Sequence, residues 1–138
     1  MEENGSLKTM IVDDEEDNLS LYKDYLSSKG HQVTSSLTAN NIMDEYENTH
    51  PDITIIDYKL PGKDGIDAAI ELLTKYPSAP ILFVTAYDNL NKEILRNHIF
   101  ENKHIDILLK PVKLIKIETC MFNLVYKDKD SIIPHLRN

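Results

Sequence analysis

Five polar side chains come directly after runs of apolar residues, and their types suit the binding of a metal ion and a phosphoryl group. They are three carboxylates, a hydroxyl and an ammonium: Asp13, Asp14, Asp57, Thr85 and Lys110. At about 4 Å, each like-charge pair of carboxylates costs roughly 1 kcal/mol in water and about 4 kcal/mol at an effective dielectric of 20. A cation is therefore needed to hold the acids together. Hard oxygen ligands at an open edge favour Mg²⁺, which keeps bound waters and accepts phosphate oxygens.

The apolar runs before these residues predict strands of a parallel sheet. They cover residues 10–12, 53–56, 81–84 and 107–109. Continuous apolar runs suit strands that are buried on both faces by helices. In such sheets the carboxyl ends of the strands share one edge, and ligands bind in the crevice there. We therefore expect the five side chains to converge, although they are far apart in the sequence.

Apolar residues at helical spacing predict a helix after each strand. A short strand is expected near residues 32–34, and the fourth helix over about residues 89–101. Gly30 and Pro51 end the first two helices, and the third ends before Pro77. This alternation indicates a doubly wound α/β domain with five βα repeats. The apolar helical positions are Leu19, Tyr22 and Leu26; Ala39, Ile42, Met43 and Tyr46; Ile66, Ala69, Ile70 and Leu73; and Leu114, Ile117, Met121 and Leu124.

The length and composition predict one globular domain. A chain of 138 residues with 41% hydrophobic residues can form a normal core without disulfides or structural metals. The formal net charge of −8 argues against nucleic-acid binding by charge alone. We expect a folded domain over residues 7–126, a disordered leader over residues 1–6, and a short polar tail over residues 127–138.

The cysteine and the histidines do not suggest a site of their own. Cys120 lies in an apolar helical pattern, so we expect a packed core thiol in a reducing compartment. The five histidines lack metal-ligand spacing, so we expect surface residues and no zinc site. Without a signal peptide or an apolar run long enough to span a bilayer, the cytoplasm is the expected location.

Each residue at the predicted edge can be given a chemical role. Asp57 follows an apolar strand, and a partly desolvated carboxylate there is a competent nucleophile toward an activated phosphoryl group. Lys110 offers a fixed positive charge for phosphate oxygens, and a cis peptide bond to Pro111 would fix its direction. The Thr85 hydroxyl can reach a phosphate oxygen, and Ala86 leaves room beside it.

A simpler interpretation of the acidic pair is that it charges the start of a helix. The helix dipole favours acids near its N-terminus, so Asp13 and Asp14 could serve the helix that begins near Glu15. That interpretation does not explain Asp57 or Lys110.

As a set, these residues resemble the receiver domain of two-component response regulators over about residues 8–126. The resemblance implies the flavodoxin-like receiver fold, with five parallel strands in the order 2-1-3-4-5 and five helices. The matching motifs are the acidic pair Asp13-Asp14, the phosphorylated aspartate Asp57, the turn Leu60-Pro61-Gly62-Lys63-Asp64-Gly65, the switch hydroxyl in Thr85-Ala86, and Lys110-Pro111.

The resemblance also implies a ligand set and a phosphoryl donor. Mg²⁺ would be held by Asp14, Asp57 and the backbone carbonyl of Lys59, with Asp13 acting through water. The donor would be a phosphohistidine on a sensor histidine kinase or phosphotransfer protein, or a small phosphodonor. The domain would then be a phosphoacceptor that assists its own phosphorylation and dephosphorylation, rather than an enzyme.

Signalling would follow from the added charge on Asp57. Thr85 and its loop would move inward and shift the surface of the fourth helix, fifth strand and fifth helix. Moving the equilibrium between the resting and the shifted surface from 1:99 to 99:1 needs about 5.5 kcal/mol of differential stabilisation. The output would be binding to an unknown downstream protein, without direct contact to nucleic acid or membrane. A homodimer through the same surface is possible.

The sequence departs from the family pattern at several positions. Ile107 stands where the family has an aromatic residue that couples to the switch hydroxyl, so that coupling is expected to be altered. Residues 103–105 replace the usual Gly-Ala, which predicts an atypical fourth helix or following loop. Lys59 and Tyr87 flank the expected phosphate, and we expect Tyr87 to shield the acyl phosphate from water. A solvated tyrosine at a helix start is the plain alternative.

Three other functions remain open from the sequence. Ile107 motivates a phosphorylation-independent scaffold that keeps the fold without the switch. Aspartate-nucleophile phosphatases share the strand-end acids, but they need a second carboxylate two residues after the nucleophile, where this chain has Lys59. A flavodoxin-like cofactor binder would need a glycine- or serine-rich phosphate loop after the first strand, and none is present.

Overall fold

The computed structural model describes residues 5–126, in which strands and helices alternate. Residues 1–4 of the expected leader and the whole expected tail over residues 127–138 lie outside the described residues. The elements are β1 (Lys8–Val12), α1 (Glu16–Ser28), β2 (Gln32–Ser36), α2 (Ile42–Thr49), β3 (Ile53–Ile56), α3 (Gly65–Lys75), β4 (Ile81–Thr85), α4 (Leu90–Leu95), the 3₁₀ turn η1 (His98–Phe100), β5 (Ile105–Leu109) and α5 (Leu114–Tyr126).

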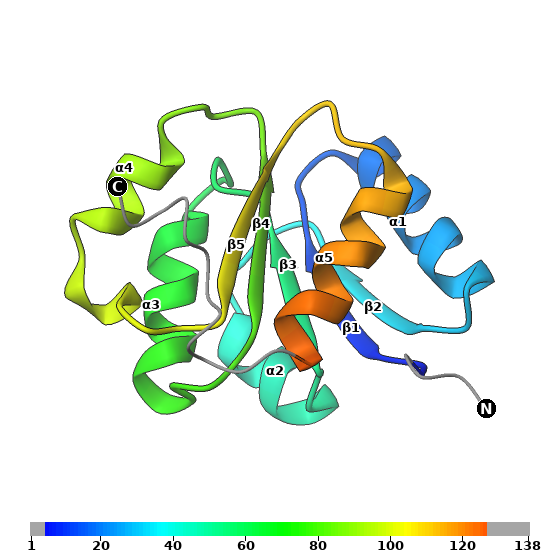
Figure 1. Ribbon diagram of the computed structural model, residues 1–138, viewed down its shortest axis with the longest axis horizontal. Coiled ribbons are helices and arrows are strands. Elements are labelled where there is room, and N and C mark those ends of the chain that lie inside the picture. Colours follow the sequence, from blue (N-terminus) through cyan, green and yellow to red (C-terminus); the bar gives the residue numbers. More distant parts are fainter. Residues whose placement is uncertain (1–4, 127–138) are drawn as a thin grey trace.

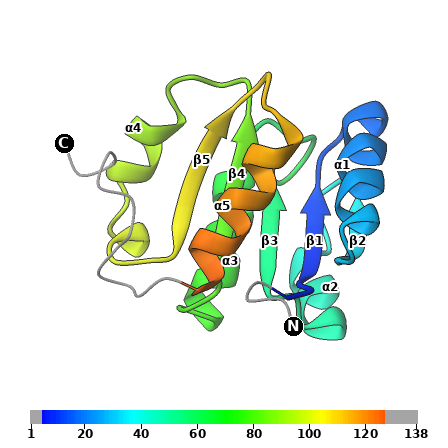
Figure 2. The same ribbon diagram turned by 45° about the vertical axis from the view of Figure 1, so that its right-hand side comes forward.

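The five strands form one parallel sheet in the order β2-β1-β3-β4-β5. Helices α1 and α5 cover one face, and α2, α3 and α4 lie on the other (Figure 1). The turned view separates the sheet from α5 in front of it and shows the strand arrows ending at a common upper edge (Figure 2). The predicted doubly wound α/β fold with strand order 2-1-3-4-5 is confirmed.

Two hydrophobic clusters fill the space between the sheet and its helices. Because successive side chains of a strand point to opposite faces, Met10 joins the cluster under α2 and α3, and Ile11 joins the cluster under α1 and α5. Strands β1, β3 and β4 are buried along nearly their whole length, as their continuous apolar runs predicted. The edge strand β2 is polar and largely exposed.

Helix α2 differs from its prediction at both ends. Ala39 is fully buried but precedes the helix, which begins at Ile42. The helix ends at Thr49 because His50 adopts a left-handed conformation, with φ of 48°, and donates its N–H to the carbonyl of Tyr46. Pro51 therefore follows the end of the helix rather than causing it.

Helix α4 is much shorter than the predicted segment over residues 89–101. It stops at Leu95, and a separate 3₁₀ turn covers residues 98–100. The side chain of Asn97 accepts a hydrogen bond from the N–H of Ile99 at 3.0 Å, which caps the new turn and interrupts the helix. The segment predicted as one helix is therefore a short helix followed by a separate 3₁₀ turn.

His31 contradicts the prediction that all five histidines lie at the surface. Its side chain is 1% exposed. The Nδ1 atom accepts the N–H of Leu7 at 3.0 Å, so the proton lies on Nε2, which is 2.7 Å from the Glu118 carboxylate. This contact ties the start of the sheet to α5. No sequence pattern indicates this contact, because Glu118 is 87 residues away from His31.

Cys120 is buried between α5 and the sheet, as predicted. Among the helices of residues 5–126, none has the length and apolar character needed to cross a membrane.

Candidate functional site

The hydrogen bonds of the sheet continue one residue beyond the strands and place the polar side chains. The N–H of Asp57 donates to the carbonyl of Val12 at 3.0 Å, and the N–H of Asp13 donates to the carbonyl of Ser36 at 3.1 Å. On the other side of the sheet, the N–H of Lys110 donates to the carbonyl of Thr85 at 2.8 Å. The residues that follow the strands therefore keep the positions and directions that the sheet imposes.

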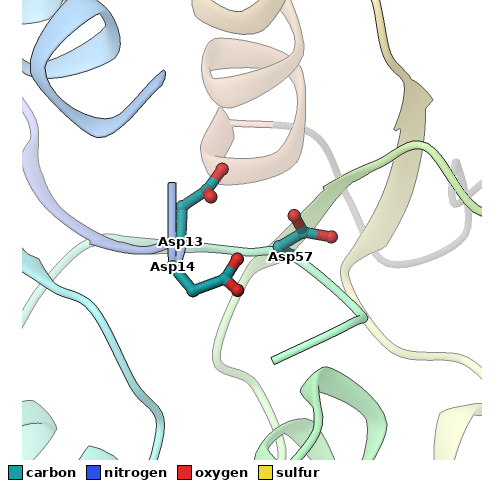
Figure 3. A group of neighbouring side chains, drawn as sticks. All are labelled: Asp13, Asp14 and Asp57. Atoms are coloured by element: carbon teal, nitrogen blue, oxygen red, sulfur yellow. The ribbon is translucent and has the colours of Figure 1, made fainter. Parts of the chain in front are cut away.

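Three carboxylates meet at this edge. Asp13, Asp14 and Asp57 each offer one oxygen, and these oxygens lie within 4.8 Å of one another. Figure 3 shows two of the side chains coming from the end of β1 and the third from the end of β3. Asp13 and Asp57 are buried, whereas Asp14 is exposed. The cluster therefore has two inner acids and one acid that faces solvent.

Lys110 neutralises part of this charge. Its Nζ lies 2.8 Å from Asp57 Oδ2, 3.1 Å from Asp13 Oδ2 and 3.3 Å from Glu15 Oε1. Burial by itself lowers the pKa of Lys110, but the hydrogen bonds to Asp57 and Asp13 outweigh this and raise the pKa above its usual value. The peptide bond between Lys110 and Pro111 is cis. The ammonium is thus held as a permanent charge beside Asp57.

The negative charge of Asp13 is disfavoured by its surroundings. Burial raises the pKa of its carboxyl above the usual value. The N–H of Glu15, 2.9 Å from Asp13 Oδ1, and the Lys110 ammonium act in the opposite direction without cancelling the effect. Folding therefore holds a carboxylate where its charge is disfavoured, and a further cation at this edge would offset that cost.

The turn after Asp57 has little freedom. The N–H of Gly65 donates to the carbonyl of Tyr58 at 2.8 Å, so the turn closes on itself. A Cβ atom at Gly65 would lie 2.3 Å from the backbone oxygen of Asp57, and only glycine avoids that clash. Asp64 then caps α3 by accepting the N–H of Asp67 at 2.8 Å. The glycine and aspartate of the predicted turn thus fix the backbone that presents Asp57.

Thr85 lies at the same edge, and its side chain is engaged with its own loop. The residue is 1% exposed, and its Oγ1 accepts the N–H of Tyr87 at 3.2 Å. Ala86 is exposed beside it. Ile107, at the position of the expected coupling residue, is partly buried against the cluster on the α3 side of the sheet.

Tyr87 and Lys59 contact each other rather than lying as two separate flanking residues. The Lys59 ammonium lies 4.7 Å from the centre of the Tyr87 ring and 4.6 Å from the centre of the Tyr58 ring. The two rings are 5.0 Å apart. The sequence pattern does not predict Tyr58 as a site residue.

Two further residues near the site were missed as site residues. Glu15 was considered only as a helix start, yet its carboxylate contacts Lys110 and accepts a hydrogen bond from Asn18 Nδ2 at 2.6 Å. Its position two residues after Asp13 was the available signal. Tyr22, buried in α1, is within electrostatic reach of Lys110 and Asp13. No sequence signal separates Tyr22 from an ordinary core tyrosine.

Comparison with known protein families identifies the family of this chain. A family model described as the response regulator receiver domain matches residues 9–121. The chain belongs to this family. It is therefore a receiver domain of a two-component response regulator, and its strand order is the one that the resemblance implied.

Related proteins match the receiver at low identity. The regulatory protein LuxO of Vibrio vulnificus is 24% identical over 117 residues, which cover 85% of this chain and 25% of LuxO. The receiver therefore spans about a quarter of the length of that relative.

Solved structures share the fold at similarly low identity. A response regulator receiver domain from Clostridium thermocellum has a TM-score of 0.74 at 22% identity and covers 86% of this chain and 93% of its own. The BeF₃-activated receiver domain of RstA from Klebsiella pneumoniae has a TM-score of 0.75 at 21% identity, with 87% and 99% covered.

Proposed function

We propose that this receiver accepts a phosphoryl group on Asp57 in a Mg²⁺-dependent reaction and signals through contacts with other proteins. The observation that carries the proposal is the buried carboxylate of Asp57, 2.8 Å from the Lys110 ammonium and beside two further acids. A structural aspartate would be satisfied by Lys110 alone. The additional acids create a negative site that favours a divalent cation.

The transfer step requires one nucleophile and one fixed charge from this chain. An oxygen of Asp57 attacks the phosphorus of a phosphohistidine, the P–O bond forms, and the P–N bond breaks. The electron pair of that bond returns to the imidazole nitrogen, which takes up a proton as the donor leaves. The ammonium of Lys110 then faces the phosphoryl oxygens and stabilises their charge. The donor would be a cytoplasmic sensor histidine kinase, a phosphotransfer protein, or a small phosphodonor.

The donor atoms at the site fit Mg²⁺. Asp14, Asp57 and the backbone carbonyl of Lys59 would hold the ion, with Asp13 acting through water. All are oxygen ligands, and the exposure of Asp14 leaves room for bound water and phosphate. When bound, the ion would offset the negative charge of the acids and of the incoming phosphoryl group.

The output would be a change in protein binding. Phosphorylated Asp57 would draw the Thr85 hydroxyl inward, and the loop of Thr85 would carry α4 with it. The surface of α4, β5 and α5 would then bind a downstream protein, with a second copy of the receiver as one possible partner. The exposed apolar side chains of Leu95 on α4 and Tyr126 on α5 support protein contact there.

Intact mass tests the proposal directly. With Mg²⁺ and acetyl phosphate, the parent should gain about 80 Da, the mass of one phosphoryl group. The Asp57→Asn variant should not, and the Asp88→Asn variant, which changes an exposed aspartate after β4, should behave as the parent does. No gain in the parent, or an equal gain in Asp57→Asn, would contradict the proposal.

Ile107 favours one alternative function. Without an aromatic residue at this position, the fold could serve as a phosphorylation-independent scaffold. Titration with beryllofluoride and Mg²⁺, followed by NMR, separates the two functions. A phosphoacceptor should show saturable shifts at Asp57 and Thr85, whereas a scaffold should show none.

A further inference from the structure

We infer that Tyr58, Lys59 and Tyr87 form a clasp that holds the Thr85 loop in its resting position and thereby opposes activation. This inference rests on the proposed function and adds a regulatory element to the same site. The clasp joins two loops. Tyr58 and Lys59 lie between β3 and α3, and Tyr87 lies between β4 and α4.

The contacts of the clasp are mutual. The rings of Tyr58 and Tyr87 are 5.0 Å apart and tilted by 37°. The Lys59 ammonium lies 4.6 Å from one ring centre and 4.7 Å from the other. Each ring therefore contacts both the cation and the other ring, a combination of cation–π and aromatic contacts.

One side of the clasp is fixed. The carbonyl of Tyr58 accepts the N–H of Gly65 at 2.8 Å, and Gly65 packs so closely under the Asp57 backbone that a Cβ atom would clash there. The backbone at Tyr58 is therefore held to the start of α3, and we expect it to stay in place when the facing loop moves.

The other side of the clasp is joined to the switch hydroxyl. Tyr87 follows Thr85 by two residues, and its N–H donates to Thr85 Oγ1 at 3.2 Å. On this inference, an inward movement of Thr85 toward a phosphoryl group on Asp57 shifts Tyr87 as well and separates its ring from Tyr58 and Lys59. The clasp contacts would be lost in that movement, so they stabilise the resting position over the active one.

The clasp is also joined to α4. The carbonyl of Tyr87 accepts the N–H of Leu90, the first residue of α4, at 3.4 Å. A clasp that opens would therefore alter the start of α4 without an aromatic residue at position 107.

Tyr58→Leu tests the clasp without touching Thr85, Tyr87 or an acid of the site. The expected result is beryllofluoride binding, in the presence of Mg²⁺, that is about tenfold tighter than in the parent, because the resting position has lost its stabilising contacts. Damage to the site would weaken binding instead. Tyr58→Phe keeps the ring and should bind as the parent does. Tyr25→Leu should also bind as the parent does, since it removes a ring that contacts Lys29 in α1 at 5.5 Å, on an element outside the clasp.

Amide hydrogen exchange without metal or beryllofluoride tests the clasp independently of phosphorylation. Exchange of the Tyr87 amide should be about tenfold faster in Tyr58→Leu, and unchanged in Tyr58→Phe and Tyr25→Leu. Unchanged exchange in Tyr58→Leu would overturn the clasp. Faster exchange of the Tyr87 amide in Tyr58→Leu, together with unchanged or weaker beryllofluoride binding, would overturn the opposing role of the clasp. Absence of beryllofluoride binding in the parent would refute the proposed function while the exchange result still decides the clasp.

Discussion

The side chains at the sheet edge carry an unbalanced charge. One ammonium, Lys110, contacts three carboxylates, and Asp14 adds a fourth acid nearby. Two of the acids are buried, so solvent screens their repulsion poorly. The arrangement lowers stability when no cation is bound and favours the arrival of one. This is a common compromise at sites built for binding rather than for stability.

Lys110→Met should lower the free energy of unfolding by about 3 kcal/mol, because it leaves buried carboxylates without their partner. Urea unfolding in the presence of a chelator measures the change. Lys113→Met, which alters an exposed lysine three residues later, should be nearly neutral. Equal stability of Lys110→Met and the parent would show that the ammonium does not compensate the acids.

Asp13→Asn should raise the free energy of unfolding at pH 7 by about 1 kcal/mol, because it removes a partly screened repulsion between like charges. The raised pKa of Asp13 means that the folded state binds its proton more tightly than the unfolded state does. Stability from this group is therefore present at low pH and lost as pH rises through the folded pKa. The advantage of Asn should shrink as pH falls toward 4 in chelator-treated protein. An advantage that grows on acidification would contradict this assignment.

Tyr87→Ala should shorten the lifetime of the aspartyl phosphate about tenfold, which corresponds to about 1.4 kcal/mol in the hydrolysis barrier. The reason is that the Tyr87 ring is expected to limit the access of water to the acyl phosphate. Tyr87→Phe keeps the ring and serves as the control. Loss of phosphate followed by intact mass gives the rate, and equal half-lives for all three proteins would exclude shielding.

The residues of the site were more predictable than their contacts. Asp13, Asp57, Thr85 and Lys110 could be identified because each ends an apolar run, and parallel strands must bring such residues to one edge. Ring contacts and ion pairs depend on side-chain directions across loops, which periodicity does not encode. Tyr58 and Glu15 were missed for that reason.

At the scale of elements, the turn between β3 and α3 shapes the site most directly. Gly65 begins α3 directly beneath the Asp57 backbone, and Asp64 caps the same helix. The first turn of α3 and the end of β3 are therefore packed backbone to backbone. Any side chain at Gly65 must displace one of them.

Gly65→Ala should lower the free energy of unfolding by about 3 kcal/mol, at the upper end of the cost of overpacking. Magnesium affinity, measured by titration calorimetry, should fall as well, because the Asp57 backbone must shift. Gly5→Ala is the matched control, since a Cβ atom there would meet nothing within 4 Å. A Gly65→Ala protein with the stability and magnesium affinity of the parent would contradict the close packing.

Element boundaries were predicted where a local signal ends the element and were wrong where a side chain or backbone contact does so. Helix α1 ends just before Gly30, as expected. Helix α2 ends at a left-handed histidine, and α4 ends where Asn97 starts a new turn. Histidine is not a usual helix terminator, and several asparagines between residues 89 and 102 could each cap a turn, so neither end could be identified from residue type alone.

At the scale of the whole molecule, the sheet separates two hydrophobic cores. Beside the core under α1 and α5, His31 joins Leu7, which precedes β1, to Glu118 in α5. Cys120 lies in the same core. The rate at which a thiol in that position reacts with a reagent measures how often the core under α1 and α5 opens to solvent.

Cys120 should react with a thiol reagent at least a thousandfold more slowly in the native protein than in the unfolded one, because reaction requires opening. Burial also raises the pKa of the Cys120 thiol, which keeps it protonated near neutral pH. A Thr119→Cys, Cys120→Ser variant places the thiol at an exposed neighbouring position and should react quickly. Rapid reaction of native Cys120 would indicate a loosely packed α5.

The short α4 has a consequence for motion. A six-residue helix is well below the length at which helices are stable in water, so its conformation depends on two buried anchors, Leu90 and Ile94, and on Phe100 beyond it. Such a segment can melt and refold at small free-energy cost while the five-stranded platform stays intact. The receiver therefore carries a short helix with few packed anchors directly after the loop of Thr85, where a change of charge at the proposed site would be translated into a different surface shape.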